Sequence, residues 1–316
     1  MNFSTAFILC KPDLFLRGLL PKFLTSLEEQ NFFIKEFFCG KVTSNHFRLM
    51  YTAHFRYDVD DWQHNQKLYE FGPALGLLLS NSTTTSPLSA LNSLKGAALP
   101  SERKIDSLRY LFGSKSRLFN LLHVPDQIEH SYTEALHWFG VNKWEEGSSY
   151  PISKKEVLNE IEQNGYHSIG SLDPEYAFLK AKIRLMHAIQ KRAIVSNTFH
   201  STIQSLKIFY TLWAEEVSTS PLFNGIEGTI LTSRYKEEQE RLLALQELLP
   251  LPSPILSSLR LLLLLPAKPK FATNFFWILD EWHVFVSPLE QYLITSRLKY
   301  SELTTFVLPT EAQHCT

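Results

Sequence analysis

The hydrophobic pattern of the chain changes near Trp144, and this change constrains the fold more than any other feature. Before it, short apolar runs of strand length are mixed with amphipathic helical patterns. After it, apolar residues recur at the 3.6-residue period of a helix over long stretches, with few strand signals. We therefore predict two domains, residues 1–143 and 151–316, which a chain of 316 residues can accommodate.

The first region reads as an α+β fold. Ala6–Cys10 has the pattern of a buried strand, and Leu20–Leu27 has that of a helix. Further strands are expected over Phe32–Val42, over "FGPALGLLLSN" and over Arg117–Leu122. Strands and helices that are mixed without strict alternation indicate an α+β sandwich.

A helix should begin directly after the last of these strands. Asp126 is a good N-cap, and Glu129 three residues later completes a capping-box pattern. Apolar residues from Ile128 to Phe139 then share one helical face. This arrangement places His123 at a strand end, close to the start of a helix.

The second region predicts a mainly α-helical domain. Asp173 and Pro174 form an N-cap and N1 pair, and "RYKEEQERLLALQELL" is a strong helical pattern. The histidines His187, His200 and His283 lack the close spacing of metal ligands. We predict no metal site in this region, and its leucine-rich helices suit either a hydrophobic core or a surface for a protein partner.

The amino-acid composition indicates a globular protein. Hydrophobic residues make up 44% of the chain, and the net charge of −1 gives no sign of a general nucleic-acid or membrane-surface binder. Three cysteines without a CxxC pair suggest free thiols in a reducing compartment. The leucine run Leu261–Leu265 is too short to span a bilayer. We expect a globular cytoplasmic protein with no membrane association.

Six short features follow one another in the first region. They are "FILCKPDLFLRGL", Tyr51, "FGP", "SLRYLF", "NLLHVPD" and "EALHWF". Each alone is weakly specific, but their order and spacing resemble the nucleoside diphosphate kinase family over roughly residues 4–140, less than half of the chain. The resemblance implies a ferredoxin-like, four-stranded antiparallel sheet covered by helices.

The resemblance also implies the reaction. A neutral imidazole is a good nucleophile near pH 7, and His123 matches the histidine that the family phosphorylates in a ping-pong cycle. Glu134 matches the glutamate that hydrogen-bonds and orients that imidazole. The substrates would be nucleoside di- and triphosphates, with Mg²⁺ carried on ATP.

The same resemblance implies five nucleotide-binding residues. Lys11, Tyr51 and Arg109 match residues that hold phosphate, and Asn120 matches the asparagine that contacts the ribose. Trp62 falls near the base-stacking aromatic, in a register that "FGP" leaves open by one or two residues.

Three positions depart from the family pattern. The second phosphate arginine falls on Asn92, a phosphate-contacting threonine falls on Ala98, and the serine that bonds the catalytic glutamate has become Pro125. A charge-assisted hydrogen bond contributes about 1.5–3 kcal/mol, so nucleotide binding should be weaker than is usual for the family. Lys95 or Lys115 could replace the missing charge.

These observations leave two hypotheses. In the first, the protein is a nucleoside diphosphate kinase, possessing a phosphohistidine intermediate. In the second, it is a catalytically weakened nucleotide-binding or scaffold protein that acts through its helical domain. The family forms dimers assembled into larger oligomers, and the added domain leaves a homo-oligomer here open.

Overall fold

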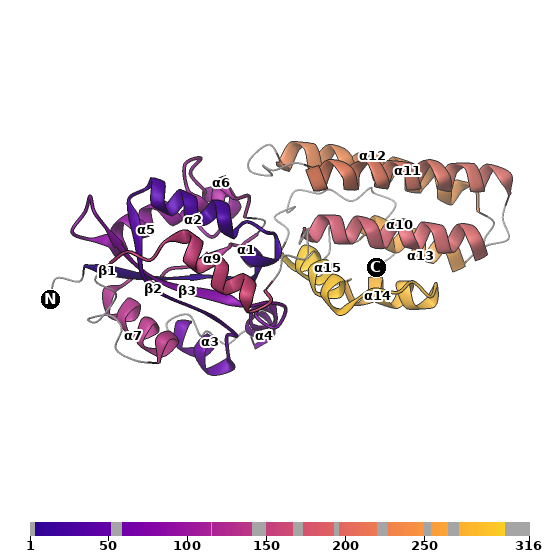
Figure 1. Cartoon of the computed structure of the whole chain (residues 1–316). Helices are drawn as coiled ribbons and strands as arrows, with labels where there is room; N and C mark the ends of the chain where they lie inside the picture. The colour runs from indigo at the N-terminus through magenta and orange to yellow at the C-terminus, as the bar shows by residue number, and fades with distance from the viewer. Residues whose placement is uncertain are drawn as a thin grey trace. The chain divides into compact units, whose positions relative to one another are not determined.

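The computed structural model of the chain divides into two compact units, Met1–Ser171 and Leu172–Thr316 (Figure 1). The residues that the structure describes are 4–51, 59–114, 116–140, 150–166, 173–192, 196–219, 227–249, 254–264 and 272–300.

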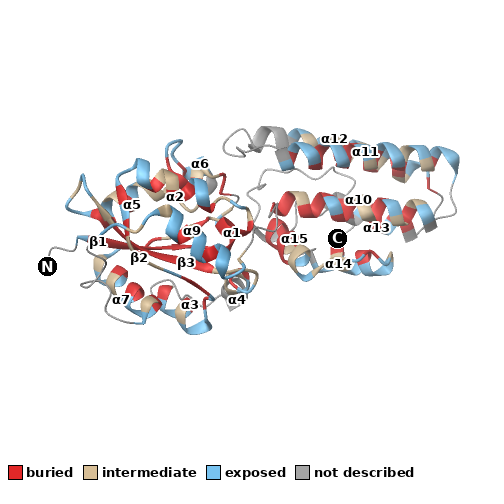
Figure 2. Cartoon of the chain, in the orientation of Figure 1, coloured by how far each residue is buried: buried red, intermediate tan, exposed pale blue. Residues whose placement is uncertain are grey.

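A four-stranded antiparallel sheet lies at the centre of the first unit, as predicted (Figure 1). Its strands are β1 (Thr5–Cys10), β2 (Phe32–Gly40), β3 (Ala74–Asn81) and β4 (Leu122–His123), in the order β2-β3-β1-β4. All six residues of β1 are buried, because this inner strand has helices on both faces (Figure 2).

Helices cover the two faces of the sheet (Figure 1). Helices α2 and α5 lie on one face, where Ile8 and Cys10 of β1 join Phe23 of α2 in the core. Helices α3 and α7 lie on the other, where Phe7 packs edge-on against Phe139 with ring centroids 6.1 Å apart. The helices are α1 (Pro12–Leu16), α2 (Leu20–Glu29), α3 (Ser44–Met50), α4 (Val59–Leu68), α5 (Pro87–Lys95), α6 (Leu108–Leu111) and α7 (Ile128–Phe139), with a 3₁₀ turn at Pro100–Glu102.

A single aromatic side chain seats α7 on the sheet. A Cβ atom at Gly76 of β3 would lie 2.1 Å from Cδ1 of Trp138, so only glycine leaves room for the indole. The indole N–H of Trp138 donates a 3.0 Å hydrogen bond to the carbonyl of Phe38 in β2. This close seating fixes the height of α7 above the strands, and Glu134 lies one turn before Trp138 on that helix.

Helix α9 (Lys154–Gln163) lies within the range expected for the helical domain, yet it packs on the first unit. Ile152 forms an isolated bridge with Ile34, its N–H lying 2.8 Å from the Ile34 carbonyl oxygen. Val157 and Ile161 belong to the same hydrophobic core as the sheet. The compact first unit therefore extends beyond the predicted boundary at residue 143, because these residues complete its core.

The described residues of the second unit form helices and no strands. The predicted cap of its first helix is confirmed, since Asp173 Oδ1 accepts hydrogen bonds from the N–H groups of Glu175 and Tyr176. None of the helices in the described ranges is both long and apolar enough to span a bilayer. The helices are α10 (Pro174–Arg192), α11 (Asn197–Thr219), α12 (Glu227–Glu247), α13 (Pro254–Leu264), α14 (Ala272–Glu281) and α15 (Pro288–Tyr300).

A buried ion pair joins α10 to α12 in this unit. Lys182 is fully buried, and its Nζ lies 2.6 Å from Oε1 of Glu238. The Tyr210 hydroxyl of α11 donates a second 2.6 Å hydrogen bond to the same oxygen. The ammonium also lies 4.1 Å from the ring centroid of Phe178. Three helices therefore meet at one charged contact that water does not reach.

Candidate active site

His123 is the last residue of β4, and β4 is shorter than predicted. A strand was expected over Arg117–Leu122, whereas only Leu122 and His123 pair with β1. Leu121 has a φ of 70°, a left-handed conformation that a strand cannot contain. Its N–H donates to Asp13 Oδ2 at 2.9 Å instead of joining a neighbouring strand. The sequence pattern identified an apolar run but not this break in it.

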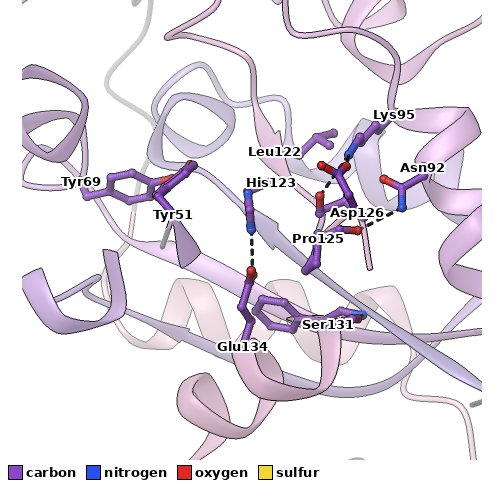
Figure 3. Close-up of polar contacts among 12 residues, drawn as sticks. Tyr51, Tyr69, Asn92, Lys95, Leu122, His123, Pro125, Asp126, Ser131 and Glu134 are labelled. Atoms are coloured by element: carbon purple, nitrogen blue, oxygen red, sulfur yellow. Dashed lines mark hydrogen bonds and ion pairs between the residues drawn. The ribbon is translucent and has the colours of Figure 1, made fainter. Parts of the chain in front are cut away.

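His123 and Glu134 form a direct side-chain pair (Figure 3). Nε2 of His123 lies 2.7 Å from Oε2 of Glu134, and the two side chains are 15% and 6% exposed. A carboxylate can only accept a hydrogen bond, so Nε2 carries the proton in this pair. In the neutral imidazole the lone pair then lies on Nδ1. The geometry selects one tautomer and leaves one ring nitrogen nucleophilic.

The helix that carries Glu134 begins one residue later than predicted. Gln127 is the N-cap of α7 and makes no side-chain capping bond, so the expected capping box of Asp126 and Glu129 is wrong. The Asp126 carboxylate instead lies 2.9 Å from the ammonium of Lys95 (Figure 3). An opposite charge nearby competes with the backbone N–H groups for this carboxylate.

Tyr51 lies beside the imidazole. It caps the C-terminus of α3, and its ring centroid is 5.1 Å from that of His123. Its hydroxyl lies 3.2 Å from the hydroxyl of Tyr69, a residue that follows α4 and is 2% exposed. Burial raises the pKa of Tyr51 to about 12. No sequence motif pointed to Tyr69, which lies three residues before Gly72 of "FGP".

Lys11 and Asn120 also lie together. The Lys11 ammonium donates to the carbonyl of Leu118 at 2.7 Å and to Oδ1 of Asn120 at 3.1 Å. Burial lowers the pKa of Lys11 to about 8, with the nearby Arg109 acting in the same direction and Asp13 opposing it. The lysine therefore titrates close to neutral pH.

Arg109 is buried and binds backbone carbonyls around the site. Its guanidinium donates to the carbonyl oxygens of Asn120, Gly96 and Leu122 at 3.1, 2.8 and 2.8 Å. Burial lowers the pKa of Arg109. The bonds to Asn120 and Leu122 fix the backbone directly before His123, so Arg109 holds the strand that presents the imidazole.

Two of the departures from the family pattern, Asn92 on α5 and Pro125 after β4, contact each other. The Asn92 amide donates a 3.0 Å hydrogen bond to the Pro125 carbonyl, and the ammonium of Lys95, one turn later, donates to the Val124 carbonyl at 3.0 Å. Lys95 is a described cation on the same helix as Asn92, where the family has an arginine. It is therefore a candidate to supply the missing charge. Lys115 lies outside the described residues.

Ala98 and Trp62 are the other two described positions that the family pattern indicated. The Ala98 carbonyl accepts a 2.8 Å hydrogen bond from Arg103, a buried arginine that the sequence did not single out. Trp62 lies in α4, and its side chain is outside the described part of the structure. Within the described residues, no three His, Cys, Asp or Glu side chains form a group that could hold a metal ion.

Comparison of the sequence with protein-family models agrees with the motif series. The family model "Nucleoside diphosphate kinase" matches residues 4–144. The chain is 19% identical to a solved nucleoside diphosphate kinase from Encephalitozoon cuniculi, covering 49% of this chain and 99% of that one, with a TM-score of 0.39. A nucleoside diphosphate kinase family protein from Babesia bovis is also 19% identical, with the same coverage and a TM-score of 0.40. No curated protein matches the chain.

The match ends before α9, and the family model does not extend into the helical unit. The motif series, the antiparallel sheet and the His123–Glu134 pair all fall inside the matched range. Residues 4–144 are therefore a domain of the nucleoside diphosphate kinase family.

Proposed function

We propose that the first unit transfers the γ-phosphate of ATP to a nucleoside diphosphate through a phosphohistidine at His123. The observation that carries this proposal is the 2.7 Å contact between His123 Nε2 and Glu134. It directs the Nε2 proton at the carboxylate, so the lone pair of a neutral imidazole is on Nδ1, the nitrogen that attacks phosphorus.

In the proposed first step, Nδ1 of His123 forms a bond to the γ-phosphorus, and the bond from that phosphorus to the bridging oxygen breaks, releasing ADP. In the second step, a terminal oxygen of the acceptor diphosphate attacks the same phosphorus, and the P–N bond breaks. Positive charge develops on the ring in the first step, and the Glu134 carboxylate stabilises it.

Other residues would position the phosphates. Phosphoryl transfer depends on positioning and charge neutralisation. Lys11 would supply a cation, and Tyr51, whose ring centroid lies 5.1 Å from that of His123, would supply a hydroxyl. Mg²⁺ bound by the nucleotide phosphates would neutralise their charge and keep most of its water ligands. Such an ion needs no cage of protein ligands. The described residues contain no cluster of three His, Cys, Asp or Glu side chains that would form one.

Lys11 makes nucleotide binding depend on pH. Since its pKa is about 8, the free protein loses this charge as the pH rises through 8, and a bound phosphate must then recover the proton. ATP affinity should therefore fall between pH 7 and 9, by at most about tenfold per pH unit because one proton is linked. Calorimetry across this range measures the effect.

Two variants serve as references for the pH series. Lys11→Arg stays protonated throughout, and its affinity should not follow the same pH dependence. Lys11→Met gives the uncharged baseline and should bind weakly at every pH. If the variant Lys11→Met retains the pH dependence of the wild type, Lys11 is not the group responsible.

Restoring the family's arginine tests the weakened phosphate site. Asn92→Arg adds a cation on α5 at the cost of the bond to the Pro125 carbonyl. We expect ATP to bind about tenfold or more tightly, the usual contribution of a charge-assisted hydrogen bond. Asn92→Gln, which adds length without charge, is the control. Equal affinity in Asn92→Arg and the wild type would mean that another cation, such as Lys95, already fills this role.

Product analysis tests the proposed function. Incubating the full chain with ATP–Mg²⁺ and a different nucleoside diphosphate should yield ADP and the new triphosphate in equal amounts. The same reaction with His123→Ala should yield neither above background. A triphosphate formed equally by His123→Ala would exclude the phosphohistidine route.

One observation favours a second candidate function, nucleotide binding with little turnover. The cationic groups of Lys11 and Arg109 donate to backbone carbonyls and to Asn120, so they already have partners that a phosphate would have to replace or share. In this case ATP binds and the helical unit carries the biological role. ATP binding by calorimetry without triphosphate exchange would support this candidate.

A further inference from the structure

The geometry points to Tyr69 as a positioning residue that acts on His123 through Tyr51. This inference rests on the proposed function and adds to it a residue that neither the motif series nor the family pattern supplied. In Figure 3, Tyr51 lies between Tyr69 and His123. The two hydroxyl groups are 3.2 Å apart, and the Tyr51 and His123 ring centroids are 5.1 Å apart.

Tyr69 is well placed to fix an orientation, because it is itself immobilised. Its side chain is 2% exposed, and its ring packs edge-on against Phe47 of α3 at 5.7 Å between centroids. Phe47 in turn lies 4.8 Å from the ring of Tyr51. The three aromatic rings form one packed group. Packing confines the Tyr51 ring, and the contact between the two hydroxyl groups fixes its orientation.

Tyr69 also contacts the lysine of the site. The Lys11 ammonium lies 5.8 Å from the centroid of the Tyr69 ring, within the range of a cation–π contact. One side chain therefore touches Lys11 through its ring and Tyr51 through its hydroxyl. The two contacts lie on different parts of the side chain, so substitutions can separate them.

Loss of the contact between the Tyr69 and Tyr51 hydroxyl groups should lower the rate of phosphoryl transfer more than the affinity for nucleotide. A loosened Tyr51 ring would let the neighbouring imidazole leave the orientation set by Glu134, and small losses of alignment reduce the rate of a positioned reaction. The Tyr69 hydroxyl should thus affect the step at His123, while its ring should affect the cation at Lys11.

The substitution Tyr69→Phe removes the hydroxyl and keeps the ring. We expect phosphoenzyme formation from ATP–Mg²⁺, measured in a single turnover, to slow about three- to tenfold, the effect of one neutral hydrogen bond. ATP affinity should stay within about twofold of the wild type, since the ring over Lys11 remains. Tyr69→Leu, which removes the ring as well, should also weaken ATP binding.

A double-mutant cycle separates positioning from a general loss of stability. If Tyr69 acts through Tyr51, Tyr51→Phe combined with Tyr69→Phe should be no slower than Tyr51→Phe alone. Tyr166→Phe is the matched control, because Tyr166 packs against a hydrophobic core of the same unit that does not include Tyr69 or Tyr51, and its rate should equal that of the wild type. Fully additive losses in the cycle would overturn the inference.

A spectroscopic measurement tests the inference without turnover. The imidazole resonances of His123 in nitrogen-15 spectra should shift in Tyr69→Phe and stay unchanged in Tyr166→Phe. If the wild type forms no phosphoenzyme, the proposed function fails, yet this spectrum still decides whether Tyr69 is coupled to His123. Unchanged His123 resonances in Tyr69→Phe would overturn the coupling.

Discussion

Replacing Lys182 by methionine should lower the free energy of unfolding of the helical unit by about 3–5 kcal/mol, the usual cost of breaking a buried ion pair from one side. The substitution leaves the Glu238 carboxylate buried with only the Tyr210 hydroxyl as a described hydrogen-bond donor. Its second oxygen, Oε2, already lacks a partner among the described residues. Thermal and urea unfolding of the full chain, followed by circular dichroism, measure the loss.

Two controls give this result its meaning. The double substitution Lys182→Met with Glu238→Leu removes both charges and should recover most of the lost stability, since an apolar pair is often as stable as a buried ion pair. Glu216→Ala breaks an ion pair with Arg234 whose side chains are 42% and 33% exposed, and it should change stability by less than about 1 kcal/mol. A Lys182→Met protein as stable as the wild type would show that the buried pair does not hold these helices together.

The second large effect is expected at the candidate active site. His123→Ala should take up no acid-labile phosphate from γ-labelled ATP, because the attacking nitrogen is gone. Glu134→Gln keeps the shape of the side chain but removes its charge, and it should slow phosphoenzyme formation about ten- to a hundredfold, the contribution of a charge-assisted hydrogen bond. Rapid-quench measurements on both variants and the wild type give these rates.

The chain offers a matched control for these substitutions. His130 lies on α7, the helix that carries Glu134, and is exposed. His130→Ala should label as fast as the wild type. A Glu134→Gln protein that labels at the wild-type rate would contradict the role of the 2.7 Å contact, even if His123 itself is phosphorylated.

Continuous apolar runs made parts of the fold predictable from the sequence. The runs at Ala6–Cys10 and within "FGPALGLLLSN" became the inner strands β1 and β3, which are buried along nearly their whole length. Elements with a weaker local signal were missed or misplaced. β4 contains two residues because Leu121 turns the backbone left-handed, and α9 joins the first unit through Val157 and Ile161, two apolar residues in a polar helix.

In the candidate site, too, residues within sequence motifs were predicted and a residue outside them was missed. The motif series indicated His123 and Glu134, and the structure brings these two side chains into contact. Tyr69 was missed because its contacts with Lys11 and Tyr51 join segments that are distant in the sequence. Only the fold brings these segments together, so no local pattern indicates the contacts. The predicted cap at Asp126 failed because Lys95, 31 residues earlier, competes for that carboxylate.

The central claim is that His123 carries the phosphate between two nucleotides, and a chase experiment tests it most directly. Full-length protein is labelled with γ-labelled ATP–Mg²⁺, freed of nucleotide, and mixed with an unlabelled nucleoside diphosphate. We predict that the label sits on His123 by peptide mapping and passes to the nucleoside triphosphate. A protein that binds ATP but takes up no label, or holds label that the diphosphate cannot remove, would contradict this account.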